Sequence, residues 1–73
     1  MKLPVVSGRD VIRALEKIGF KTVRIKGSHA KLRKDYRTVI VPLHDELSKG
    51  TLKSIIRQAG ITKEQLIELL EDP

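Results

Sequence analysis

Hydrophobic residues recur at helical spacing near the start of the chain. Between residues 8 and 18 an apolar residue recurs every three or four positions, which places on one helix face Val11, Ile12, Leu15 and Ile18. Ser7 is a good N-cap because its hydroxyl can accept a backbone N–H of the first turn, and Asp10 faces the positive end of the helix dipole. Gly19 follows the last apolar position, where a left-handed residue commonly ends a helix. The pattern predicts an amphipathic helix between Ser7 and Gly19.

From Phe20 onward the alternation of polar and apolar residues has a period of two, which is typical of β-strands. The pattern predicts a first strand over residues 20–26. We expect Val23 and Ile25 on one face of this strand, and on the other face Thr22, Arg24 and Lys26. Gly27-Ser28 then marks a hairpin turn.

A second strand begins at His29. Ala30 and Leu32 are expected on one face, and on the other face His29, Lys31 and Arg33. His29 therefore lies on the cationic face. After a turn over residues 35–37, the stretch 38–41 is almost wholly β-branched, as in a central or well-covered strand, and Pro42 ends it because proline has no N–H for the ladder.

Helical spacing returns in the C-terminal part of the chain. After a loop over residues 43–47, Ser48 or a residue just after it can cap a second helix that ends at Gly60, with apolar positions at Leu52, Ile55 and Ile56. Thr62 and Gln65 form a capping-box pattern at the start of a third helix. Its apolar residues are Leu66, Ile67, Leu69 and Leu70. Its last turn, 68–72, is expected to fray because carboxylates lie at the negative end of the dipole.

The element order α-β-β-β-α-α predicts an α+β fold. With 73 residues, the chain forms one small domain over 1–73, near the size where a single core is just sufficient. We expect a three-stranded antiparallel sheet with helices packed on one face. The sheet residues expected under the first two helices are Val23, Ile25, Ala30 and Leu32. The other sheet face is left to solvent or to a partner.

The net charge of +6 is unevenly distributed. Residues 1–60 hold 14 Lys and Arg against 5 Asp and Glu, hence +9, whereas residues 61–73 hold 1 against 4, hence −3. Over residues 20–37, seven cations stand against Asp35 alone. Such a cluster across two predicted strands indicates a nucleic-acid binder, although charge alone leaves open a solvated face on a basic protein.

Composition also limits the kinds of site. The chain has no cysteine, which excludes disulfides and thiolate metal sites and favours a reducing compartment, so we expect a cytoplasmic protein. Its longest apolar run, residues 39–41, is far too short for a membrane span, and no membrane partner is expected. The acidic residues between Gly19 and Gly60 form no obvious carboxylate cluster, so neither a metal nor another cofactor is expected.

His29 is the leading candidate for chemistry, because histidine titrates near neutral pH and this one follows a Gly-Ser turn among cations. RNA carries its own nucleophile, the 2′-hydroxyl, so cleavage needs a group that moves a proton and cations that stabilise phosphoryl charge. We expect His29 to act as general base or acid. The residues expected to bind RNA are Arg24, Lys26, Lys31 and Arg33, with backbone N–H groups of Gly27 and Ser28. Ser28 as a nucleophile is disfavoured because no triad is visible.

Four segments together resemble a known family: Gly27-Ser28-His29, then Ile40-Val41-Pro42 with His44 close behind, then Glu46-Leu47, then residues 50–61. In this order they are similar to the HicA toxins of bacterial and archaeal toxin–antitoxin pairs, over roughly residues 3–70. The resemblance implies a fold like the double-stranded RNA-binding domain. It also implies sequence-relaxed mRNA cleavage that arrests translation, neutralisation by a cognate HicB antitoxin, and a catalytic histidine that falls on His29.

Several alternatives remain open from the residues. The second proton-transfer group is His44, Tyr36 or nothing in the protein. For His44 a structural role in the loop after Pro42 is favoured, and the Tyr36 ring either stacks on a base or packs over the sheet. The alternative function is a non-catalytic RNA-binding domain of similar fold. A DNA-binding module fits less well because no predicted helix concentrates side chains suited to base edges. An antitoxin that covers the His29 face would exclude RNA.

Overall fold

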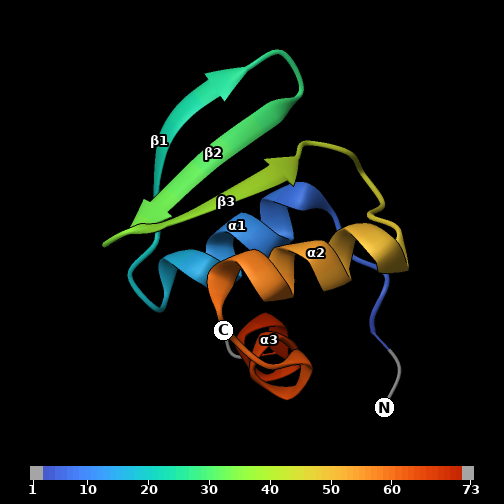
Figure 1. Cartoon of the computed structure of the whole chain (residues 1–73). Helices are drawn as coiled ribbons and strands as arrows, with labels where there is room; N and C mark the ends of the chain where they lie inside the picture. Colours follow the sequence, from blue (N-terminus) through green and yellow to red (C-terminus); the bar gives the residue numbers. More distant parts are fainter. Residues whose placement is uncertain (1–2, 72–73) are drawn as a thin grey trace.

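The computed structural model describes residues 3–71, and its elements follow the predicted order (Figure 1). They are α1 (Gly8–Glu16), β1 (Lys21–Lys26), β2 (His29–Lys34), β3 (Arg37–Pro42), α2 (Lys49–Ala59) and α3 (Lys63–Glu71). The strands form one antiparallel sheet in the order β1-β2-β3. The prediction of an α+β fold in the order α-β-β-β-α-α, with a three-stranded antiparallel sheet, is confirmed.

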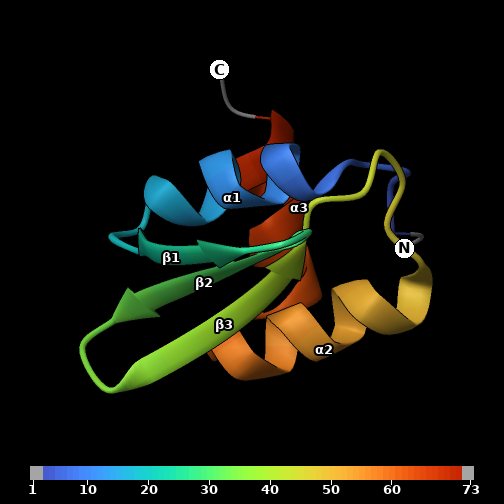
Figure 2. The ribbon, with the colours of Figure 1, turned by 90° about the horizontal axis from the view of Figure 1, so that it is seen from above.

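All three helices lie on one side of the sheet. α1 and α2 pack directly against it, whereas α3 packs against α1 and α2 on their far side. Figure 2 shows α1 and α2 to either side of α3. The core between these layers includes from the helices Val11, Leu15, Leu52, Ile55 and Leu66, and from the sheet Ala30, Leu32, Val39 and Val41. The opposite face of the sheet carries no element of the described chain.

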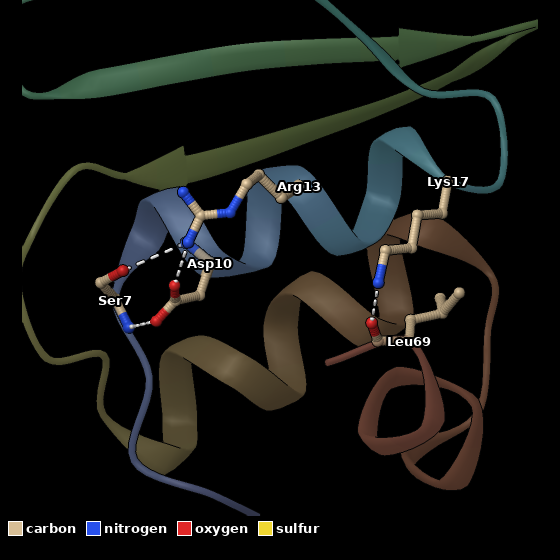
Figure 3. Close-up of polar contacts among 5 residues, drawn as sticks. All are labelled: Ser7, Asp10, Arg13, Lys17 and Leu69. Carbon is tan, nitrogen blue, oxygen red and sulfur yellow. Dashed lines mark hydrogen bonds and ion pairs between the residues drawn. The ribbon is translucent and has the colours of Figure 1, made fainter. Parts of the chain in front are cut away.

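The start of α1 is closed by a reciprocal capping box (Figure 3). The Ser7 hydroxyl accepts the backbone N–H of Asp10 at 3.1 Å, and the Asp10 carboxylate accepts the backbone N–H of Ser7 at 3.1 Å. Arg13 donates to the same carboxylate at 2.6 Å, and beyond the helix Lys17 Nζ donates to the Leu69 carbonyl of α3 at 2.7 Å. The predicted N-cap is confirmed, and Asp10 does more than face the dipole because it also accepts a cap hydrogen bond.

This cap makes part of the stability depend on pH. The Ser7 backbone N–H, the Ser7 side chain and the Arg13 guanidinium hold the pKa of the Asp10 carboxyl below its ordinary value of 3.8. A lowered carboxyl pKa stabilises the fold above the ordinary value, and that contribution is lost as the pH falls through the lowered pKa. We expect Asp10→Asn to melt below wild type at neutral pH, with a difference that shrinks below about pH 3.8. Thermal unfolding followed by circular dichroism across pH would test this, and a gap that stays constant would contradict it.

The other two helices start and end with the predicted signals. Ser48 caps α2 by accepting the Thr51 N–H at 3.1 Å, and Gly60 ends it with a left-handed φ of 72°. Thr62 and Gln65 cap α3 reciprocally, at 2.8 and 3.0 Å. α3 is helical through Glu71, and Asp72, the last residue of the turn expected to fray, lies outside the described residues. No helix in the described part of the chain is both long and apolar enough to cross a membrane.

The face assignment predicted for the first strand is wrong at its start. Thr22 pairs with Leu32 and Arg24 pairs with Lys31, so Val23 is an extra residue in a β-bulge. Residues directly opposite each other share a face, so Thr22 lies on the helix side with Leu32, and Lys21, opposite Arg33, joins the other side. Because side chains alternate with a period of two, one inserted residue moves every earlier side chain to the other face.

β1 also lacks the helix cover that the sequence predicts. Ala30 and Leu32 of β2 are fully buried, as expected, but Val23 is 53% exposed and Ile25 is 61% exposed. α2 packs on β3, and α1 contacts both β3 and β1. The tip of the β1–β2 hairpin rises away from both helices in Figure 1. The two helices do not reach across the whole twisted sheet, so the edge strand β1 projects beyond them.

β3 is well covered but not central. Val39 and Val41 are fully buried beneath the helices, whereas the strand itself is at an edge of the sheet. Gln58 of α2 reaches this edge, and its side-chain oxygen accepts the backbone N–H of Ile40 at 2.9 Å. A polar side chain thus occupies part of the edge that would otherwise be open to another strand.

Candidate functional site

The sheet face away from the helices, called here the outer face, collects basic residues. The register places Lys21 opposite Arg33, Arg24 opposite Lys31 and Lys26 opposite His29. All of these side chains are exposed, and together they are Lys21, Arg24, Lys26, His29, Lys31 and Arg33. The bulge at Val23 increases the positive charge of the outer face, because it places the cationic Lys21 there in place of the neutral Thr22.

A shallow hollow of about 460 Å³ lies at the part of the outer face near the β1–β2 turn. It is lined by Arg24, Lys26, His29, Ala30, Lys31 and Ile40. Ile40 is 39% exposed and gives the hollow an apolar element beside its three cations. Arg24, Lys26, Lys31 and His29 of the predicted site are therefore brought together at one place. Arg33 lies further along the same face, opposite Thr38.

His29 is held at the first position of β2, opposite Lys26 on one side and Pro42 on the other. The turn before it depends on Gly27, which adopts a left-handed φ of 58° in open space, so backbone conformation rather than room favours glycine there. Ser28 Oγ lies 3.5 Å from His29 Nδ1. The exposed imidazole thus stands at the end of a paired strand, with its position set by two neighbouring strands.

His44 lies next to His29, although fifteen positions separate them in the sequence. The ring centroids are 6.4 Å apart and the ring planes are inclined at 68°. Two backbone hydrogen bonds fix the loop that carries His44. The Leu43 N–H donates to the Ser28 carbonyl at 2.6 Å, and the Gly8 N–H donates to the His44 carbonyl at 2.9 Å.

Gly8 permits this arrangement, and sequence reasoning did not identify it. A Cβ at Gly8 would overlap the carbonyl oxygen of Pro42, so only glycine lets the start of α1 approach the end of β3 this closely. The sequence shows only that a glycine directly follows the N-cap serine. Most residue types are accepted at this helix position, so nothing local requires a glycine there. The reason for glycine is a tertiary contact with a strand 34 positions away, which no local pattern shows.

Tyr36 is not brought to His29. It lies in the turn between β2 and β3, and β2 is six residues long, so roughly 17 Å of strand separates the two. The ring is 84% exposed and does not pack over the sheet; the Arg37 guanidinium carbon lies 5.6 Å from its centroid. Of the two residues considered for a second proton-transfer group, the structure places only His44 beside His29.

None of the three strands carries an acidic residue, and the acidic residues next to them in the sequence lie in turns and loops. Asp45 and Glu46 are exposed in the loop after His44, and Asp35 lies in the turn beside Tyr36. Within residues 3–71, no group of three or more His, Cys, Asp or Glu side chains could hold a metal ion.

A protein-family model matches most of the chain. The family model described as HicA toxin of bacterial toxin–antitoxin matches residues 8–61, from the start of α1 to the residue after the Gly60 cap. A search of curated proteins found no match to the chain. The matched span is shorter than the expected 3–70, and it leaves out α3, which also lies farthest from the sheet. Because this model covers about three quarters of the 73 residues, the chain belongs to the HicA family of toxins of toxin–antitoxin systems.

Proposed function

We propose that this HicA-family toxin is an endoribonuclease that cleaves mRNA without a metal ion and thereby arrests translation. The observation that carries the proposal is the hollow on the outer face, where an exposed histidine lies among the side chains of Arg24, Lys26 and Lys31. Cations at this density attract a polyanion, and the histidine supplies a group that can move a proton near neutral pH. A non-catalytic binding face needs the cations but not the histidine.

The reaction proposed for this site is transesterification within RNA. The 2′-oxygen attacks the adjacent phosphorus, the bond to the 5′-oxygen breaks, and the products are a 2′,3′-cyclic phosphate and a 5′-hydroxyl. His29 serves as general base or general acid in this reaction. Arg24, Lys26 and Lys31 stabilise the charge on the phosphoryl oxygens, and the backbone N–H groups of the Gly27-Ser28 turn are further donors.

The outer face also suggests how RNA lies on the protein. Lys21 and Arg33 continue the basic surface along β1 and β2 beyond the hollow. We propose that neighbouring phosphates bind to these two residues while the cleaved phosphate lies beside His29. Besides His29 the hollow offers Ile40 but no Phe, Tyr or Trp side chain for a base, which agrees with weak sequence preference.

A toxin of this family acts with an antitoxin partner. We propose that a HicB-like antitoxin covers the outer face with carboxylates or with bulk, because the same surface then cannot bind RNA. A complex in which the outer face stays open and still binds RNA would contradict this.

The test is cleavage of a long single-stranded RNA by the purified protein in excess EDTA. We expect fragments that end in 2′,3′-cyclic phosphate, in amounts unaffected by the chelator. Addition of the antitoxin should stop the reaction. Binding without cleavage would overturn the proposal in favour of a non-catalytic RNA-binding domain, and cleavage abolished by EDTA would overturn its metal independence.

A further inference from the structure

We propose that His44 is the second proton-transfer group of this site and acts with His29 on the same phosphodiester. The proposal rests on the ribonuclease function proposed above and specifies its mechanism. It is carried by the 6.4 Å separation between the two exposed rings. A proton donor or acceptor must come within about 2.6–3.2 Å of the oxygen it serves. Two rings at this separation can each reach a different oxygen of one phosphoryl group.

The pair is held in place by the fold. His29 is fixed by pairing with Lys26 and Pro42 on both sides of β2. The His44 loop is joined to the β1–β2 turn through the Leu43 N–H and Ser28 carbonyl, and to α1 through the His44 carbonyl and Gly8 N–H. Both imidazoles are thus carried by backbone that the sheet and α1 hold together, as a preorganised acid–base pair requires.

A structural role for the His44 ring is less consistent with these contacts. The bond that anchors residue 44 to α1 uses its backbone carbonyl, which any residue would provide. The side chain is exposed, so it contributes little buried surface to the core. The loop should therefore keep its shape when the ring is replaced, and the ring is available for chemistry.

Two histidines can carry out both proton transfers of the reaction without another catalyst. One neutral imidazole removes the proton of the 2′-hydroxyl as the 2′-oxygen attacks phosphorus. The other, protonated, gives its proton to the 5′-oxygen as the bond between phosphorus and that oxygen breaks. One proton has then moved from the second ring to the first, and exchange with water restores the starting forms. No metal, cofactor or redox partner is needed.

The two rings have different charged neighbours. Around His29 the hollow carries Arg24, Lys26 and Lys31. His44 is followed in its loop by Asp45 and Glu46, and the first turn of α1, which holds the loop, carries Arg9 and Asp10. Because one ring must be neutral and the other protonated, the rate should rise and then fall with pH.

The experiment compares cleavage of a single-stranded RNA by wild type, His44→Gln and His29→Gln, with Glu46→Gln as a control in the same loop. We expect His44→Gln to lower kcat by about 10²–10⁴-fold, to leave RNA affinity unchanged and to remove one limb of the pH–rate profile. Glu46→Gln should keep both limbs. Because both rings are exposed, their replacement should not disturb folding. Thermal midpoints equal to that of the wild type would show that the variants are folded.

A second substrate separates proton transfer from positioning. At a cleavage site mapped with the wild type, the 5′-bridging oxygen is replaced by sulfur, which leaves without protonation. One of the two histidine variants should regain most of its rate on this substrate, and the variant that does so has lost the general acid.

Each outcome bears on one proposal. If the wild type cleaves and His44→Gln keeps its rate and both pH limbs, the histidine pair is overturned while the ribonuclease stands. If both variants are slow and sulfur restores neither, His44 only positions the site and the pair is again overturned. If the wild type does not cleave RNA at all, the ribonuclease proposal fails, and the pair fails with it.

Discussion

Replacing His29 with glutamine is expected to lower kcat for RNA cleavage by about 10²–10⁴-fold, the range found when a positioned acid or base is removed. Glutamine keeps a polar side chain of similar size, so the exposed position should tolerate it without loss of folding. RNA affinity should stay near the wild-type value, because Arg24, Lys26 and Lys31 remain in place around the hollow. Single-turnover cleavage measured beside equilibrium RNA binding separates the two effects.

Tyr36→Phe is the control for this variant. It also removes a titratable group, but one that lies beyond the far end of β2, so its cleavage rate and pH profile should match the wild type. If His29→Gln cleaved as fast as Tyr36→Phe, His29 would be no more than one of several phosphate ligands. Loss of cleavage together with loss of binding would also contradict an acid–base role.

The second strand shows what the sequence predicts well. Burial of Ala30 and Leu32 in the core dictates a strict alternation, so His29 and Lys31 had to face outward. The helix caps at Ser7, Ser48 and Thr62 were equally predictable, because they depend on hydrogen bonds made within four residues. At these positions the local hydrogen bonds and the burial of apolar side chains favour the same structure, so the sequence alone was enough to predict it.

The first strand shows where the pattern fails. No glycine or proline marks the bulge at Val23, and threonine, valine and isoleucine suit either face of a strand, so the sequence offers no sign of an extra residue. Its apolar residues suggested a covered strand, but cover depends on how far two helices reach beneath a twisted sheet. That reach is a tertiary property which the alternation does not encode.

The pairing of His29 with His44 was also beyond the sequence. It requires the register of β3, a hydrogen bond from Leu43 to Ser28 and the close approach of α1 at Gly8. None of these is local, so the sequence pointed to the first histidine and left the second proton-transfer group open between His44, Tyr36 and no residue of the protein. Only the three-dimensional arrangement separates those two candidates.

The second large effect is expected from removing the cations of the hollow together, as Arg24→Gln, Lys26→Gln and Lys31→Gln in one protein. If each contacts a phosphate, the slope of log affinity against log salt should fall by about 2 for single-stranded RNA, and affinity at low salt should fall roughly 10- to 100-fold. Cleavage of saturating RNA should also slow, because the same cations stabilise the phosphoryl charge. Binding titrations at several salt concentrations measure the slope.

A matched triple variant tests whether position or total charge matters. Arg57→Gln, Lys49→Gln and Lys53→Gln also remove one arginine and two lysines, all exposed, but from α2 on the other side of the sheet. Long-range attraction falls equally in both proteins, because their net charges are equal. Only the outer-face triple should show the full decrease of about 2 in the salt slope. Only this variant should also cleave bound RNA more slowly than the wild type. If the two triple variants lost equal affinity and equal salt slope, RNA binding would depend on overall charge. The outer face would then not be the RNA-binding surface.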